Sequence, residues 1–94
     1  MIEYTVRVHA NGDKFWFLNG KLHREEGPAI EYVNGDNEWY LNGKLHREEG
    51  PAVEYVNGDN EWYLNGKQLS EKKFNKKMNK PTELPLTLKE KDND

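Results

Sequence analysis

The chain contains no cysteine among its 94 residues. Disulfide bonds, zinc sites built on thiolates and cysteine nucleophiles are therefore excluded, and small secreted domains usually depend on disulfides for stability. The sequence also lacks an apolar run long enough to cross a membrane, and it has no apolar segment behind a basic N-terminus of the kind that directs secretion. We therefore expect a cytoplasmic protein that does not enter a membrane.

Aliphatic residues are scarce as well. Leu, Ile, Val and Phe total 19 residues, close to the level of about 20% below which disorder is expected, and charged residues make up 33%. Two observations oppose disorder, because the formal net charge is only −3 and the chain carries three Trp, five Tyr and three Phe. We therefore expect one small folded domain, with a thin core that is aromatic rather than aliphatic.

An internal repeat organises the sequence. Residues 11–33 (NGDKFWFLNGKLHREEGPAIEYV) and 34–56 (NGDNEWYLNGKLHREEGPAVEYV) are identical at 19 of 23 positions, and a third copy departs from the pattern at Gln68. A fixed period of this length indicates a repeat architecture, in which each copy packs on its neighbours. The sequence thus predicts a repeat domain over residues 1–69, with copies at 11–33, 34–56 and, in part, 57–69.

Each copy contains two turn signals. Asn19-Gly20, Asn42-Gly43 and Asn65-Gly66 each separate two runs of β-forming residues, and Asn-Gly favours the two-residue turn of a β-hairpin. The NGD triplet that opens each copy marks a second, slightly longer turn. Gly27-Pro28 and Gly50-Pro51 interrupt the run that follows each hairpin, because proline cannot donate to a sheet. The sequence predicts a mostly β fold, an antiparallel meander of repeated hairpins in a single twisted sheet.

The position of each turn also predicts which residues face one another. A two-residue loop at Asn42-Gly43 places Tyr40 opposite Leu45 and Trp39 opposite His46. Directly opposite side chains share one face of a sheet, and Leu69 takes the place of the histidine in the last copy. We therefore expect a structural ladder on one face, formed by Trp16, Trp39, Trp62, His23 and His46.

A helix is expected after the repeats. Ser70 is a good N-cap, and Glu71 suits the positive end of the helix dipole. Phe74 and Met78 lie four residues apart, so that they share one helix face. We predict that a capping helix over residues 70–80 covers the last copy and that an extended or flexible tail follows over 81–94. The basic patch on this helix consists of Lys72, Lys73, Lys76, Lys77 and Lys80.

The motif W-x-x-N-G-K-x-H, followed by a glycine, an aromatic residue and N-G-D, recurs once in each full copy. The chain thereby resembles the MORN repeat family, and most closely its variant with N-G-K-x-H-R-x-x-G-P-A copies, which occurs in antitoxin-type bacterial proteins and in phage and viral proteins. Asn19–Ala29 and Asn42–Ala52 carry this motif, and the resemblance extends over residues 6–69. It implies a sheet of stacked hairpins. The family's His-Gly pair is replaced by His46-Arg47, so its membrane-docking role is not carried over.

Catalysis and metal binding find little support in the sequence. HREE occurs at His23–Glu26 and again at His46–Glu49, which leaves open a metal or acid/base site assembled across copies. However, zinc sites usually draw histidines in pairs or triads, and each copy has one. No Gly-rich phosphate loop and no Ser/His/Asp arrangement is present. We therefore expect a non-enzymatic protein without metal or cofactor, in which the histidine ring nitrogens bond locally.

The distribution of charge indicates the kind of partner. Residues 1–66 carry six basic and twelve acidic side chains, a net charge of −6. An acidic sheet suits a basic protein such as a nuclease or toxin, and the family resemblance implies an inhibitor or antitoxin of bacterial or phage type. We predict a protein-binding module that binds a nucleic-acid-handling host or defence protein. The residues predicted to bind it are Phe17, Tyr40, Tyr63, Glu38, Glu61, Arg24 and Arg47.

Two other functions stay open. Residues 67–80 carry six lysines and one glutamate, a net charge of +5, so the helix is suited to bind nucleic acid as a secondary contact, with an affinity that falls steeply with salt. Alternatively, the free edges of the sheet pair between chains and make a homodimer or a structural assembly.

Overall fold

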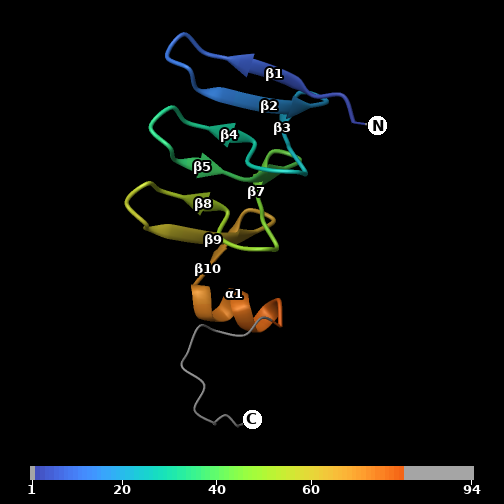
Figure 1. The fold of residues 1–94 in the computed structure, drawn as a ribbon. Coiled ribbons are helices and arrows are strands. Elements are labelled where there is room, and N and C mark those ends of the chain that lie inside the picture. Colours follow the sequence, from blue (N-terminus) through green and yellow to red (C-terminus); the bar gives the residue numbers. More distant parts are fainter. Residues whose placement is uncertain (1, 80–94) are drawn as a thin grey trace.

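The computed structural model describes residues 2–79, which form ten strands and one short helix. The strands are stacked one below another, and the helix lies at the end of the stack (Figure 1). The expected mostly β, antiparallel fold with a short C-terminal helix is confirmed. The elements are β1 (Thr5–Val8), β2 (Lys14–Leu18), β3 (Lys21–Leu22), β4 (Ile30–Glu31), β5 (Asn37–Glu38), β6 (Tyr40–Leu41), β7 (Lys44–Leu45), β8 (Val53–Glu54), β9 (Asn60–Leu64), β10 (Lys67–Leu69) and α1 (Glu71–Lys77).

The strands form two sheets rather than the single sheet expected. Eight strands make one sheet in the order β1-β2-β4-β5-β8-β9-β10, in which β3 also pairs with β2, while β6 and β7 make a separate pair. The interruption falls at Trp39, between β5 and β6. The Trp39 N–H donates to the Ala52 carbonyl on one side, and the Trp39 carbonyl accepts from the His46 N–H on the other. The chain therefore changes its bonding partner at this residue.

The hairpins have the predicted register. Tyr40 lies opposite Leu45, as the two-residue loop requires. Asn42 and Gly43 have φ angles of 53° and 80°, and positive φ at both central residues is the requirement of a type I′ turn. The first and third hairpins follow the same rule, with Phe17 opposite Leu22 and Leu69 opposite Trp62.

The chain bends after each of the first two hairpins, as the Gly-Pro dipeptides predict. β3 ends at Leu22 and β4 begins only at Ile30, and the second copy has the same gap between β7 and β8. The intervening segments 23–28 and 46–51 both read HREEGP and are called the HREEGP loops. They lie one above the other on the right-hand side of Figure 1.

The buried core is aliphatic, and the expectation of an aromatic core is wrong. The aliphatic core residues lie in or directly before β4 and β8, in the middle of the sheet. β4 is flanked by β2 and β5, and β8 is flanked by β5 and β9. The three tryptophans are only half-buried. Within residues 2–79, Phe74 of α1 is the one aromatic residue among the hydrophobic side chains that are at most 3% exposed, which are Ala29, Ile30, Ala52, Val53 and Phe74.

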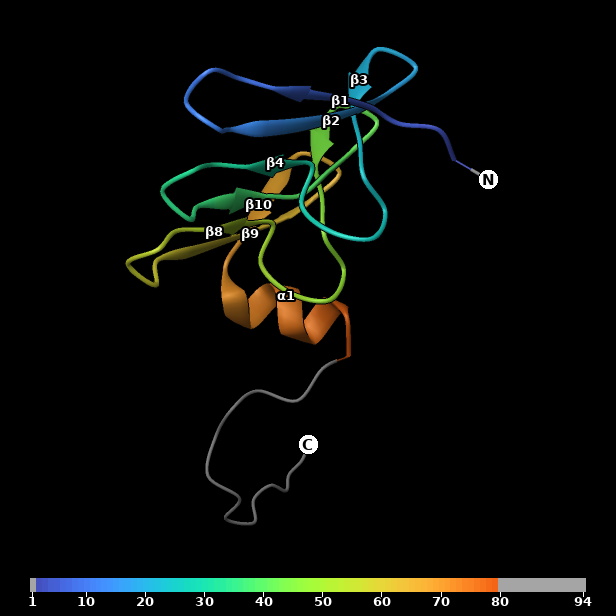
Figure 2. The same ribbon diagram turned by 45° about the horizontal axis from the view of Figure 1, so that its top comes forward.

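The capping helix begins where the sequence predicts. Ser70 is the N-cap, and its hydroxyl oxygen accepts a hydrogen bond from the Lys73 N–H at 3.1 Å. α1 packs against β9 and β10 and lies below the last strands in Figure 2. The helix ends at Lys77, and no helix within residues 2–79 is long and apolar enough to cross a membrane. Lys72, Lys73, Lys76 and Lys77 are exposed, whereas Lys80 and the expected tail 81–94 lie outside the described residues.

Candidate functional site

The histidine of each HREEGP loop bonds to the following copy. Nδ1 of His23 accepts a hydrogen bond from the Asn42 N–H at 2.9 Å, and His46 accepts one from the Asn65 N–H at the same distance. Because a backbone N–H only donates, Nδ1 carries no proton and Nε2 is the protonated nitrogen. Nε2 of His23 lies 3.2 Å from a carboxylate oxygen of Glu25. Nε2 therefore bonds within its own loop, as the sequence predicts, whereas Nδ1 bonds to the following copy.

An arginine of each HREEGP loop lies on a tryptophan ring. The guanidinium carbon is 3.9 Å from the ring centre for Arg24 on Trp16 and 3.8 Å for Arg47 on Trp39. Arg47 also donates to Glu54 at 3.1 Å, which fixes the direction of its planar fork. The arginines thus cover the rings of two tryptophans that do not pack inside the aliphatic core.

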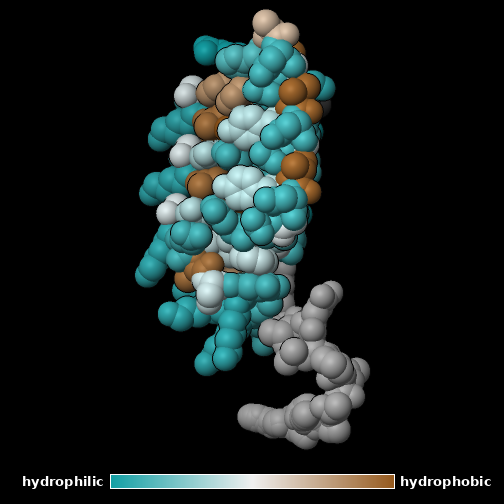
Figure 3. All heavy atoms as spheres, turned by 90° about the vertical axis from the view of Figure 1, so that its left-hand side faces the viewer, coloured by the Kyte–Doolittle hydropathy of each residue, from teal (hydrophilic) through white to brown (hydrophobic). Residues whose placement is uncertain are grey.

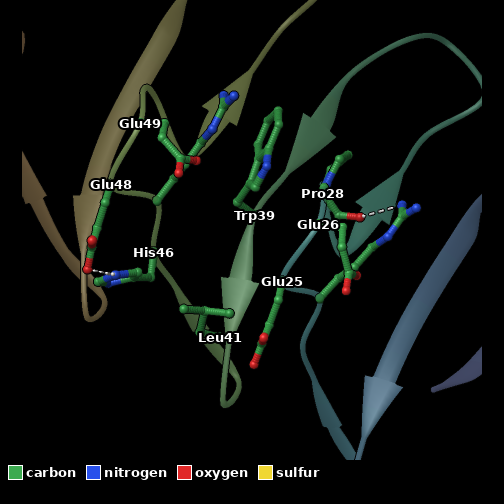
Figure 4. Close-up of a pocket in the computed structure, with 11 residues that line it drawn as sticks. Glu25, Glu26, Pro28, Trp39, Leu41, His46, Glu48 and Glu49 are labelled. Carbon is green, nitrogen blue, oxygen red and sulfur yellow. Dashed lines mark hydrogen bonds and ion pairs between the residues drawn. The ribbon is translucent and has the colours of Figure 1, made fainter. Parts of the chain in front are cut away.

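A groove of about 460 Å³ opens between the two HREEGP loops. Trp39 and Leu41 give it an apolar surface, and His46 lies beside them (Figure 4). In this view Trp39 stands between Glu49 on one side and Pro28 on the other. The rim is predominantly acidic, with four exposed glutamates and two half-buried arginines, which are Glu25, Glu26, Glu48, Glu49, Arg24 and Arg47.

Four of the five tyrosines lie on the other side of the sheet from the groove, and the exception is Tyr4, whose hydroxyl bonds to the first HREEGP loop. Successive residues of an extended strand point to opposite faces, so Tyr40 faces away from Trp39. Glu38 accepts hydrogen bonds from the hydroxyls of Tyr40 at 2.9 Å and Tyr32 at 3.3 Å. Burial, together with the bond to the Glu38 carboxylate, raises the pKa of Tyr40 far above its ordinary value. The third copy repeats this arrangement, called here the Tyr–Glu clamp, with Glu61, Tyr63 and Tyr55.

The predicted partner-binding residues are therefore divided between two faces. Phe17 and the two Tyr–Glu clamps share one face, where the ring of Phe17 lies 5.1 Å from the guanidinium carbon of Arg7. Arg24 and Arg47 lie on the tryptophans instead. The groove was not predicted from the sequence. Its signal was nevertheless present, since both HREE motifs are charged and occupy the same place in consecutive copies.

A third surface is formed by the NGD turns. The Asp13 carboxylate accepts a hydrogen bond from the Val33 N–H at 2.8 Å, and Asp36 accepts one from the Val56 N–H at 2.9 Å. Both valines are exposed. Figure 3 views the molecule from this side and shows hydrophobic patches recurring along the stack among hydrophilic residues. The NGD turn that opens each copy thus bonds to the valine that ends the same copy, on the side away from the HREEGP loops.

No protein-family model, curated protein or solved structure matches the chain. Within residues 2–79, no three His, Asp or Glu side chains are placed so as to hold a metal ion. The apolar surface of the groove and the charge around it indicate which kind of ligand it can bind. A cationic side chain with an aliphatic stem fits them, because the stem lies on the indole while the cation meets the carboxylates.

Proposed function

We propose that the chain is a non-enzymatic protein-binding module and that the groove between the HREEGP loops binds a basic segment of its partner. The observation that supports this proposal is the combination of an apolar surface, from Trp39 and Leu41, with four exposed carboxylates around it. Arginine and lysine are the side chains that satisfy both parts of such a site.

The charge of the whole repeat region supports the same kind of partner. The net charge of −6 over residues 1–66 attracts a basic protein over distance and increases the rate of association. A nuclease or a toxin that handles nucleic acid has a basic surface of this sort. The proposed role is that of an antitoxin-like inhibitor of bacterial or phage type, acting in the cytoplasm.

We also propose that the chain is a member of the MORN-like family of hairpin repeats. This membership is supported by contacts that recur with the period of the sequence. The bond from the Asn42 N–H to His23 is repeated one copy later, and so is the bond from the Val33 N–H to Asp13. The first bond joins one copy to the next, and the second joins the start of a copy to its end.

The groove is tested with a short Arg- and Lys-rich peptide, whose binding to the full chain is measured by calorimetry at physiological salt. Replacing Glu25 and Glu48 by Gln removes two rim charges and is expected to weaken binding about tenfold. The matched control replaces the exposed Asp59 by Asn and the exposed Glu71 by Gln, which gives the same net charge and leaves the groove intact. Equal loss in both variants would show attraction by net charge alone and would overturn the groove as the site.

The exposed lysines of α1 favour a second candidate function, the binding of nucleic acid. Lys72, Lys73, Lys76 and Lys77 lie along one short helix and are all exposed. Contacts with phosphates release counterions, so the affinity for a mixed oligonucleotide pool is expected to fall steeply as salt rises. A flat salt response, or no binding at low salt, removes this candidate.

A further inference from the structure

The two ends of the main sheet differ. At one end α1 packs against β9 and β10. At the other end β1 pairs with β2 on one side, and no residue within 2–79 pairs with its outer edge. All four residues of β1 are exposed, Val6 to 44% and Val8 to 62%. Figure 1 shows β1 as the outermost strand. Such an edge presents backbone N–H and C=O groups to another strand.

We propose that β1 pairs with β1 of a second copy of this chain around a two-fold axis, which joins two sheets into one with a helix at each end. An axis perpendicular to the sheet makes the two strands antiparallel and keeps each face on the same side. Odd-numbered residues then pair with odd-numbered ones, and even-numbered residues with even-numbered ones, because directly opposite side chains share a face.

The register centred on Thr5 fits both faces of the strand. On one face it places Glu3 opposite Arg7 of the second copy, and the symmetry gives this ion pair twice. On the other face it places Tyr4 opposite Val6 and Ile2 opposite Val8, which are apolar pairs. The strand then extends from Thr5–Val8 to residues 2–8.

Neighbouring registers are less favourable. Pairing centred on Arg7 places two arginines directly opposite one another, which is destabilising. Pairing centred on Val6 gives no pair between Glu3 and Arg7. The register centred on Thr5 is therefore selected by charge and apolar contact together.

Two contacts prepare the edge for this pairing. The Tyr4 hydroxyl accepts a hydrogen bond from the Glu25 N–H at 2.9 Å and donates one to Glu26 at 3.2 Å, so the segment before β1 is already held against the first HREEGP loop. Charged residues on an edge strand often prevent pairing. Here the Arg7 guanidinium lies over the ring of Phe17, on the face of the sheet, and leaves the edge itself accessible.

Sedimentation of the full chain over a range of concentrations tests the proposal, with a monomer–dimer equilibrium expected. Arg7→Glu is expected to weaken dimerisation about tenfold, because two ion pairs become repulsive contacts. The double variant Glu3→Arg with Arg7→Glu restores opposite charges between the copies and is expected to recover dimerisation. A monomer at all concentrations, or a dimer that ignores these substitutions, overturns the proposal.

The absence of cysteine permits a second, geometric test. Thr5 lies on the proposed axis, so Thr5→Cys places two thiols within the range for a disulfide, and mild oxidation is expected to link the copies quickly. Lys44→Cys, at an exposed hairpin position far along the stack, is the matched control. Equal rates of crosslinking for the two variants overturn the edge pairing. Peptide binding in the groove is measured separately, so failure of one proposal is distinguishable from failure of the other.

Discussion

Nδ1 of His23 accepts a hydrogen bond from the backbone N–H of Asn42, 19 residues further along the chain. This bond ties the first HREEGP loop to the turn of the second hairpin. His46 repeats the bond to Asn65, whereas the third copy has Leu69 at the equivalent position, beside the capping helix. The histidines therefore set the spacing of the loops that form the groove.

Replacing His23 by Leu tests this relationship. The variant places an apolar side chain at a position that is 5% exposed but leaves the Asn42 N–H without its acceptor. We expect a loss of about 1–3 kcal/mol in the free energy of unfolding, measured with urea. His9→Leu is the control, because His9 is exposed and contacts the Phe15 ring instead. An equal effect of both substitutions would be inconsistent with the bond. Nitrogen chemical shifts of His23 are expected to show an unprotonated Nδ1.

Alkaline pH is expected to destabilise the fold because the tyrosine hydroxyls ionise. Burial and neighbouring glutamates raise the pKa of every tyrosine above the ordinary value of 10.0. The unfolded chain therefore loses phenol protons first, so this contribution to stability is complete below the ordinary pKa and is lost as the pH rises through the folded-state values. Phenolate absorbance and circular dichroism are followed together. Ionisation at the ordinary pH with the dichroism unchanged would contradict the prediction, and the chain in urea provides the reference titration.

Removing the tyrosine hydroxyls of the Tyr–Glu clamps tests whether the tyrosine face of the sheet takes part in binding the basic peptide. Tyr40→Phe combined with Tyr63→Phe keeps both rings but removes the bonds to Glu38 and Glu61. We expect each change to lower the free energy of unfolding by about 1 kcal/mol and to leave binding of the basic peptide unchanged. Loss of peptide binding in this variant would instead favour the tyrosine face as the partner surface.

Acid is expected to weaken the junction at the first NGD turn. The Val33 N–H and the Asn11 side chain donate to the Asp13 carboxylate and hold its pKa below the ordinary value. This contribution to stability is present above the ordinary carboxyl pKa and is lost as the pH falls through the lowered value. Asp13→Asn is therefore expected to lower the urea midpoint at neutral pH more than at low pH. Asp59→Asn is the control, since Asp59 belongs to the last NGD turn. An equal, pH-independent change in both variants would count against this account.

Local features of the fold follow from single residues and their neighbours. Asn42-Gly43 determines the pairing of Tyr40 with Leu45, and Ser70 determines the start of α1, so both were predictable. Burial depends on how copies stack. Ala52 is fully buried because β8 has a strand on each side, which composition does not reveal. The groove has the same origin, because it forms only where the equivalent loops of two consecutive copies come side by side.

Two glycines of the NGD turns provide a matched pair for testing how the copies pack. Gly35 and Gly58 have φ angles of 102° and 90°, so an alanine is strained at either position. A Cβ on Gly35 would lie 2.5 Å from a methyl carbon of Val56, whereas a Cβ on Gly58 would meet nothing within 4 Å. Gly35→Ala is therefore expected to cost about 1–3 kcal/mol more than Gly58→Ala in the free energy of unfolding.

Shortening the valine provides the rescue for this test. Val56→Ala removes the methyl groups that the new Cβ would meet, so the pair Gly35→Ala with Val56→Ala is expected to recover most of the difference. Thermal and urea unfolding of the four variants measure the coupling between the two positions. Equal destabilisation by the two glycine substitutions, or the absence of rescue, would show that the valine that ends a copy does not rest on the turn that opens the same copy.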